Sequence, residues 1–179
     1  MNDFILINIV LIWFISIVNL ALGLRIIRTN SGEIAPKFLK VGDKAPRFHA
    51  ETIDGTSITQ VDFFDSDTFI LFLSPTCAPC RTFVPIINEL HPKLLNAGKK
   101  LVAVILADRS GTQQFINETV PQFPVVFGAN SSKKIAKDYK TASMSPFFYC
   151  IINGRVNSGG LLNSIAWNDT LNKLGLADK

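Results

Sequence analysis

Two cysteines three positions apart, Cys77 and Cys80, are the residues of this chain best suited to chemistry. Thiols at this spacing can form a disulfide and open it again, because a thiolate attacks a disulfide sulfur through a mixed-disulfide intermediate. A thiol at the start of a helix faces unpaired N–H groups and the positive end of the helix dipole, which favour the thiolate. The pair therefore predicts reversible thiol-disulfide exchange, with Cys77 as the nucleophile and Cys80 as the resolving thiol.

The elements on either side of the pair determine whether Cys77 can occupy such a helix start. Residues 69–73 form a short apolar run that Ser74-Pro75 ends, which is typical of a buried strand. From Arg81 onward the apolar residues recur on one helical face through Leu95. Pro79 suits the first turn, because it removes a donor that would be unpaired there and pre-sets φ. The cysteines are thus predicted at a strand-to-helix junction.

This segment resembles the active site of the thioredoxin-like superfamily, which also carries a proline where this chain has Pro85, eight residues after Cys77. The resemblance implies that Pro79 and Pro85 shape the active-site geometry. Two positions differ from thioredoxins: Thr76 replaces a tryptophan, and Leu71 replaces a buried acid. The resemblance to thioredoxins therefore does not account for how the proton on Cys80 is removed.

Three other roles are possible for a cysteine pair at this spacing. A zinc site needs four ligands, and beyond the pair only Cys150, His49 and His91 are candidates, so we expect no metal. A purely structural disulfide would keep the same spacing. A peroxide-reducing relative of the same fold would need a threonine, proline and arginine around its cysteine, which the residues before Cys77 and Cys80 do not supply. We also expect no cofactor.

The N-terminal 4–24 stretch has 21 residues without a charge, enough at about 1.5 Å per residue to cross a hydrocarbon core of about 30 Å. It predicts a transmembrane anchor. A cleaved signal peptide is the alternative, with Ala21-Leu22-Gly23 as a weak cleavage site, but the run exceeds an h-region of about 7 to 15 residues and no basic n-region precedes it.

Two arguments predict opposite orientations for this anchor. Arg25 and Arg28 follow the helix, so the positive-inside rule would place the domain in the cytoplasm. Disulfides, however, persist outside the reducing cytosol, where an anchored thiol-disulfide domain is most useful. We therefore expect the catalytic domain to be extracytoplasmic, on the periplasmic or extracellular side of the cell membrane. The chain's net charge of +4 fits a membrane-facing surface, and no basic-aromatic pattern suggests nucleic acid.

Residues 25–40 are predicted as a juxtamembrane linker and 41–177 as the catalytic domain. The domain opens with V-G-D-x-A-P-x-F at residues 41–48, which resembles the start of many peroxiredoxin-like and TlpA-like domains. Asp54-Gly55 joins two strand-like runs, 48–53 and 57–61, and predicts the added N-terminal hairpin that the TlpA-like resemblance implies.

Strands and helices then alternate to the end of the chain. Further strands are expected at 101–106, 123–127, 147–152 and 155–157, and helices at 112–119, 133–139 and 165–174, with Ser131-Ser132 as a cap. Pro124 suits a strand end or edge, and Asn153-Gly154 a hairpin turn. The pattern predicts an α/β thioredoxin-like fold: a central mixed sheet flanked by helices.

Ser145-Pro146 precedes a strand and resembles the cis-proline loop that faces the cysteines in thioredoxin-like proteins. The resemblance implies that this loop pairs with an incoming substrate strand; a trans proline at a strand start is the alternative. Cys150, four residues further in an apolar strand, is expected to be an inert buried thiol.

The N-terminal arrangement, together with S-P-T-C-x-x-C, is similar to the MauD-like proteins of methylamine utilisation, which are implicated in disulfide formation during methylamine dehydrogenase maturation. The resemblance implies an anchored oxidoreductase for protein disulfides and dithiols. Two alternatives stay open: a thiol reductase for cytochrome c assembly, which would need a membrane electron-transfer partner, and a non-catalytic binding module.

Overall fold

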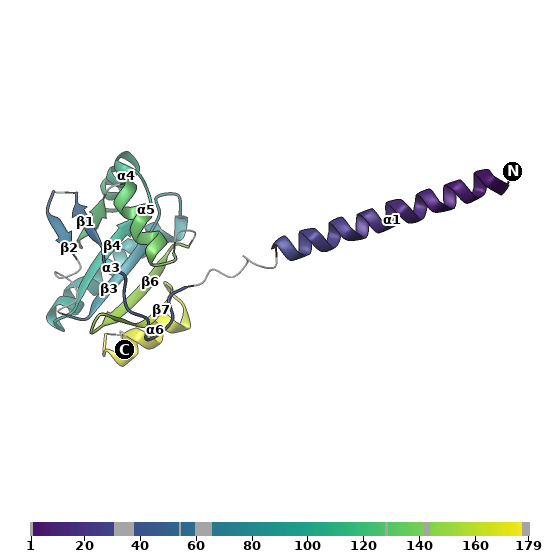
Figure 1. Ribbon diagram of the computed structural model, residues 1–179. Coiled ribbons are helices and arrows are strands. Elements are labelled where there is room, and N and C mark those ends of the chain that lie inside the picture. The colour runs from purple at the N-terminus through teal and green to yellow at the C-terminus, as the bar shows by residue number, and fades with distance from the viewer. Residues whose placement is uncertain are drawn as a thin grey trace. The chain divides into compact units, whose positions relative to one another are not determined.

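The computed structural model in Figure 1 describes residues 2–30, 38–53, 55–59, 66–127, 129–141 and 144–176. The chain divides into two compact units, Met1–Pro36 and Lys37–Lys179. We describe each unit by itself.

The first unit is one helix, α1 (Asn2–Asn30), which contains the predicted anchor. Its segment Phe4–Arg25 has 22 residues with a mean hydropathy of 2.6, and none of its most apolar window is buried inside the protein. By length and composition it could cross a membrane. The helix runs to Asn30, so residues 25–30, which were predicted as linker, are helical. The rest of that linker up to residue 37 lies outside the described residues.

The second unit is built on a seven-stranded sheet in the order β2-β1-β5-β4-β3-β6-β7. The strands are β1 (His49–Thr52), β2 (Ser57–Thr59), β3 (Thr68–Leu73), β4 (Lys100–Ile105), β5 (Val125–Phe127), β6 (Phe147–Ile152) and β7 (Arg155–Leu161). The strands β3, β4 and β5 are parallel, and the other pairs are antiparallel. The predicted mixed sheet is thereby confirmed.

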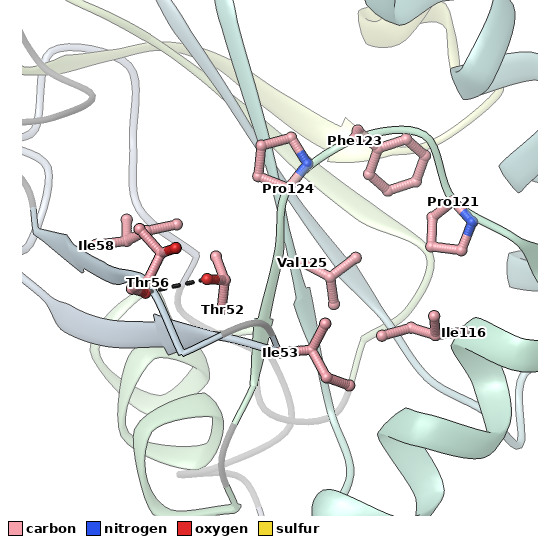
Figure 2. A pocket seen from close by; sticks show the side chains of 9 residues that line it. All are labelled: Thr52, Ile53, Thr56, Ile58, Ile116, Pro121, Phe123, Pro124 and Val125. Carbon is pink, nitrogen blue, oxygen red and sulfur yellow. Dashed lines mark hydrogen bonds between the residues drawn. The ribbon is translucent and has the colours of Figure 1, made fainter.

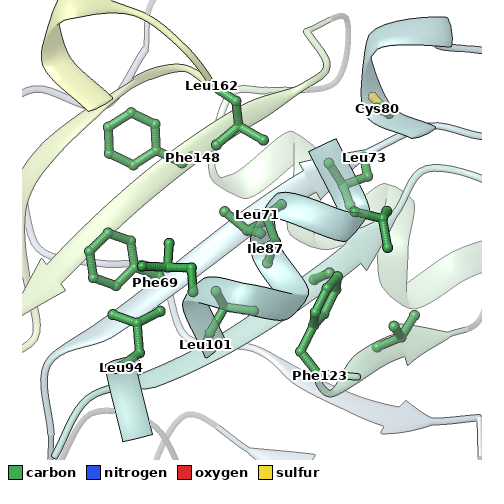
Figure 3. Close-up of a cluster of buried hydrophobic side chains, with 14 of the residues drawn as sticks. Phe69, Leu71, Leu73, Cys80, Ile87, Leu94, Leu101, Phe123, Phe148 and Leu162 are labelled. Carbon is green, nitrogen blue, oxygen red and sulfur yellow. The ribbon is translucent and has the colours of Figure 1, made fainter. Parts of the chain in front are cut away.

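Helices cover both faces of this sheet, as predicted (Figure 1). They are α3 (Ala78–Asn96), α4 (Arg109–Thr119), α5 (Ala129–Asp138) and α6 (Ile165–Lys173). The alternation of side chains along β3 sends Phe69, Leu71 and Leu73 into the core beneath α3, while Ile70 and Phe72 enter the core beneath α5. This is why the strand is a continuous apolar run, and Figure 3 shows the first of these cores under α3.

Both predicted hairpins are present. In the β1–β2 hairpin, Gly55 has φ +82° and its N–H donates to the Thr52 carbonyl at 3.0 Å; Asp54 and the predicted strand residues after Thr59 lie outside the described residues. In the β6–β7 hairpin, Asn153 and Gly154 have φ of 51° and 70°, the left-handed values that a two-residue hairpin turn requires.

One local prediction was wrong. The helix α5 starts at Ala129, so Ser131 and Ser132 are inside it and do not cap it. Ser132 is 1% exposed and its hydroxyl has no hydrogen-bond partner among the described residues. Pro124 lies directly before β5, at a strand end, which is one of the two positions expected for it; β5 itself is an internal strand.

The V-G-D-x-A-P-x-F motif packs along the β6–β7 hairpin. The Gly42 and Ala45 N–H groups donate to the carbonyls of Val156 and Gly154, at 2.8 Å and 2.9 Å. Immediately before the motif, Phe38 stacks on Phe147 with a ring-centroid separation of 4.9 Å. Residues 38–40, predicted as linker, therefore pack as part of this unit.

Candidate active site

Cys77 and Cys80 lie together at the junction between β3 and α3, as the sequence predicted. Cys77 is the N-cap of α3 with an extended backbone, and Cys80 lies in the first turn. The two form a disulfide with a Cα–Cα distance of 5.3 Å. Cys77 is partly exposed, whereas Cys80 is 0% exposed and belongs to the core. Only Cys77 can therefore be reached by a protein substrate.

Backbone donors surround both sulfur atoms. The Cys80 N–H donates to Cys77 Sγ at 3.3 Å, and the Ser74 N–H lies 3.5 Å from Cys80 Sγ. No acidic residue is present in the first turn of α3 to offset the positive helix end. Once the disulfide is reduced, this arrangement stabilises a negative charge on Cys77 more than a neutral thiol.

The loop before Cys77 is held by short contacts. The Cys77 N–H donates to the Ser74 carbonyl at 3.1 Å, and the Ser74 and Thr76 hydroxyls lie 3.0 Å apart. Pro79 occupies the first turn of α3, where its missing N–H leaves no helical acceptor unsatisfied. The loop is thus preformed around the disulfide, with Thr76, Ala78 and Pro79 exposed beside it.

The position at which thioredoxins carry a buried acid is occupied by a leucine of the core. Leu71 is 0% exposed and lies in the core that α3 covers. Among the described residues, the hydrogen bond to Cys80 Sγ comes from the Ser74 backbone and not from a carboxylate. The protein environment of this pair is therefore dominated by backbone N–H groups and the helix end.

Arg81, to which the sequence analysis assigned no role, contacts the loop before Cys77. Its guanidinium donates to the Pro75 carbonyl at 3.0 Å and pairs with the Glu118 carboxylate at 3.0 Å. The first contact is with the loop before Cys77, and the second joins that loop to α4. Its position directly after Cys80 could have pointed to it. Its partner Glu118, however, lies 37 positions away in the sequence and could not be inferred from a local pattern.

Pro85 lies inside α3, as expected, and Pro92 is a second proline in the same helix that the sequence analysis did not mention. Each lacks the N–H that an interior helical residue would donate. The helix nevertheless continues to Asn96, because Val84, Ile87, Leu90 and Leu94 bury one of its faces against the sheet.

Ser145 and Pro146 come to the same end of the sheet as Cys77. The Ser145-Pro146 bond is cis, as expected. Because β6 pairs with β3 so that Phe147 lies opposite Phe72, the residue before Phe147 lies beside the end of β3. The Pro146 carbonyl accepts from the Leu162 N–H at 3.1 Å. Pro146 is buried and Ser145 is partly exposed.

Cys150 takes no part in this arrangement. It is a free thiol, 0% exposed, on β6 opposite Phe69. Burial, followed by the nearby Asp67 carboxylate, raises its pKa to about 11. Within the described ranges no three potential metal ligands cluster, and His91 instead packs edge-on against Phe123.

A cleft of about 350 Å³ lies elsewhere on the domain, lined by Thr52, Ile53, Thr56, Ile58, Ile116, Pro121, Phe123, Pro124 and Val125 (Figure 2). Pro124 and Val125 are at the start of β5, which is parallel to β4 and through it to β3. The lining of the cleft contains neither cysteine and neither Ser145 nor Pro146, so the cleft supplies no residue to the disulfide site.

Comparison with known proteins shows which family this chain resembles. The AhpC/TSA family pattern matches residues 41–153. The chain is 26% identical over 119 residues to the thiol-disulfide oxidoreductase ResA of Bacillus thuringiensis (strain Al Hakam), covering 66% of this chain and 68% of the relative. It is 29% identical over 128 residues to ResA of Oceanobacillus iheyensis, covering 67% and 64%.

Solved structures give the same result. A Chlorobium tepidum protein assigned as thiol:disulfide interchange protein DsbE superposes with a TM-score of 0.64 at 26% identity, covering 77% of this chain and 96% of that one. A thioredoxin domain from Bacteroides vulgatus shares the fold, with a TM-score of 0.66 at 18% identity. The chain thus belongs to the AhpC/TSA family, as a thioredoxin-fold member with the cysteine pair of a thiol-disulfide oxidoreductase.

Proposed function

We propose that this protein is anchored in a membrane by α1 and exchanges disulfides with other proteins through Cys77. The observation that carries the proposal is the unequal exposure of the pair: Cys77 is partly exposed at the helix start, and Cys80 is 0% exposed behind it. A buried resolving thiol next to an accessible nucleophile suits substrates as large as proteins.

The exchange needs no group beyond the two thiols. The Cys77 thiolate attacks one sulfur of a substrate disulfide, forming a mixed disulfide and releasing the other sulfur as a thiolate that takes up a proton. Cys80, after losing its proton to solvent, attacks Cys77 Sγ and releases the substrate as a dithiol. Two electrons pass to the substrate, and the Cys77–Cys80 disulfide remains. The same steps in reverse oxidise a substrate dithiol.

Ser145 and Pro146 are proposed to receive the substrate. They lie beside the end of β3, from which residues 74–77 lead to the disulfide. An extended substrate segment can hydrogen bond to backbone groups there without regard to its sequence. Pro79 and Pro85 are proposed to keep the shape of the helix start that presents Cys77.

The membrane position is supported by the apolar helix, whose 22-residue span Phe4–Arg25 is long enough to cross a bilayer. We place the domain outside the cytoplasm, where protein disulfides persist. Arg25 at the end of this span and Arg28 after it favour the opposite orientation.

The direction of electron flow is set by the reduction potential of the pair, which depends on thiolate stabilisation. An oxidase or isomerase would serve a secreted enzyme during maturation, and the MauD-like pattern of the N-terminal segment points to a dehydrogenase of the methylamine type. A reductase for cytochrome c assembly would draw electrons from a membrane partner. A module that only binds a partner would show no turnover.

One trapping experiment separates these functions. In the full chain, Cys77→Ser should abolish exchange with a protein disulfide, whereas Cys80→Ser should stall as a mixed disulfide with its natural partner, which mass spectrometry then identifies. Cys150→Ser is the matched control and should exchange normally, because its thiol is buried. Turnover that persists in Cys77→Ser, or adducts on Cys80 instead, would refute the assignment.

A further inference from the structure

Exposed cations collect on one side of the catalytic unit. The N-terminal segment 38–48 exposes Lys40, Lys44 and Arg47, and α5 with the residues after it exposes Lys133, Lys134, Lys137 and Lys140. We call these seven residues the basic face. Against them, the same two elements carry only the Asp43 and Asp138 carboxylates.

The two elements of the basic face belong to one side of the sheet. Ala45 and Phe48 from the N-terminal segment enter the same core cluster as Ile135 and Ala136 from α5. The Tyr139 hydroxyl at the end of α5 donates to the Pro46 carbonyl at 3.1 Å and joins the elements directly.

The lysines of α5 are directed outward by the packing of the helix. Ile135, Ala136 and Tyr139 are at most 2% exposed, while Lys133, Lys134 and Lys137 are exposed on the remaining surface. None of these three lysines forms an ion pair with a described residue. No described residue therefore neutralises their charges.

The opposite side of the sheet lacks this excess. The helices α3, α4 and α6 carry four cations, Arg81, Lys93, Arg109 and Lys173, against three carboxylates, Glu89, Glu118 and Asp169. Arg81 is also paired with Glu118. The positive charge of the domain is thus concentrated on the basic face.

We propose that the basic face binds the anionic phospholipid headgroups of the membrane in which α1 is anchored. This inference rests on the membrane anchoring proposed above and goes beyond it, because it assigns a second, electrostatic contact to the domain. The membrane is the favoured partner because the basic face includes residues near the N-terminal start of the domain, which follows the anchor in the sequence. Phe38 packs on Phe147, and Lys40 and Lys44 follow within six residues.

Each basic residue alone strengthens membrane binding only modestly, whereas several of them together strengthen it substantially. Each Lys or Arg near an anionic bilayer favours binding by roughly fivefold, so three lysines together favour it by roughly a hundredfold. Because the domain is already tethered to the bilayer, its effective concentration there is high, and even a partial contribution holds it at the surface. The contact weakens as salt is added.

Amine labelling of the full chain in nanodiscs tests this contact. The protein is reconstituted in phosphatidylcholine alone or in phosphatidylcholine with phosphatidylglycerol, and reaction with a water-soluble amine reagent is followed for each lysine by mass spectrometry. We expect Lys44, Lys133, Lys134 and Lys137 to react at least roughly threefold more slowly in the anionic discs. Lys93 and Lys173 on the opposite side should react equally in both, and high salt should remove the difference.

A pair of charge-matched variants locates the contact. With Lys133→Gln, Lys134→Gln and Lys137→Gln combined, Lys44 should lose its protection although it is unchanged. With Lys93→Gln, Arg109→Gln and Lys173→Gln combined, which removes the same charge, Lys44 should stay protected. Equal labelling of Lys44 in both kinds of disc, or equal loss in both variants, would overturn the proposal. Disulfide exchange in detergent, without anionic lipid, should be normal in both variants, so a failure of the lipid contact is distinguishable from a failure of Cys77 chemistry.

Discussion

The Arg81 guanidinium and the Glu118 carboxylate lie 3.0 Å apart and join the first turn of α3 to the last turn of α4. The same guanidinium donates to the Pro75 carbonyl in the loop before Cys77. The pair therefore places a balanced set of charges next to the active-site helix start, where each charge affects the reduced form of the disulfide.

Removing Arg81 and removing Glu118 should shift the reduction potential of the Cys77–Cys80 pair in opposite directions. Arg81→Ala removes a cation, destabilises the thiolate and makes the potential more reducing; Glu118→Gln leaves the cation unopposed and makes it more oxidising. Since both side chains are more than a third exposed, at 46% and 37%, we expect shifts of only about 10 mV. Equilibration with a glutathione buffer measures them. Shifts of the same sign would show that the ion pair acts through loop structure instead.

Gly159→Ala should destabilise the domain by roughly 1–3 kcal/mol. An added Cβ would lie 2.5 Å from Cδ1 of the Tyr149 ring. This ring cannot move away easily, because Tyr149 is 0% exposed and its hydroxyl donates to the Tyr139 carbonyl at 3.0 Å.

Gly160→Ala in the same strand is the control for this substitution, since its nearest neighbour is the Ser164 hydroxyl oxygen at 3.2 Å. Urea unfolding of both variants should show the larger loss at Gly159. A loss at Gly160 as large as that at Gly159 would mean that the strand, and not the Tyr149 ring, is sensitive to the added carbon.

The domain should lose stability between pH 9 and pH 11 in part through Cys150. Burial raises the pKa of this thiol from 9.0 to about 11. Below pH 9 it is protonated in both the folded and the unfolded chain, but above pH 9 only the unfolded chain ionises, so unfolding is favoured. The loss approaches roughly 2 to 3 kcal/mol at pH 11.

Urea unfolding of the oxidised protein across this pH range measures the effect, with Cys150→Ala as the comparison. The variant has a lower stability throughout, because of the cavity, but its decline between pH 9 and pH 11 should be less steep. Tyr139 and Tyr149, whose pKa values burial also raises, contribute equally to both proteins and cancel in the difference. Parallel curves for the two proteins would contradict the assignment.

The orientation of the anchor can be tested at Cys77 itself. Intact cells, mildly reduced, are treated with a membrane-impermeant maleimide, which should label Cys77 if the domain is extracytoplasmic. Cys77→Ser should remove the label, because Cys80 and Cys150 are 0% exposed. Labelling that appears only after the cells are opened would place the domain in the cytoplasm and remove the argument for an oxidative role.

The sequence by itself determined the position and chemistry of the cysteine pair. The apolar run of β3, the proline at position 79 and the one-sided apolar pattern of α3 are local features, and they place Cys77 at a helix N-terminus whatever the rest of the chain does. The two hairpins and the apolar anchor helix were likewise predicted, since turn residues and charge-free runs act over short stretches of chain.

Only the tertiary structure decided what surrounds that pair. Arg81 meets Glu118 across 37 positions, and the Pro146 loop reaches the end of β3 only because β6 pairs beside it. The basic face likewise exists because α5 and the N-terminal segment cover the same side of the sheet. The start of α5 was predicted wrongly because Ser132 lies inside the helix and is 1% exposed, and burial of this kind depends on tertiary structure and not on the capping preference of serine.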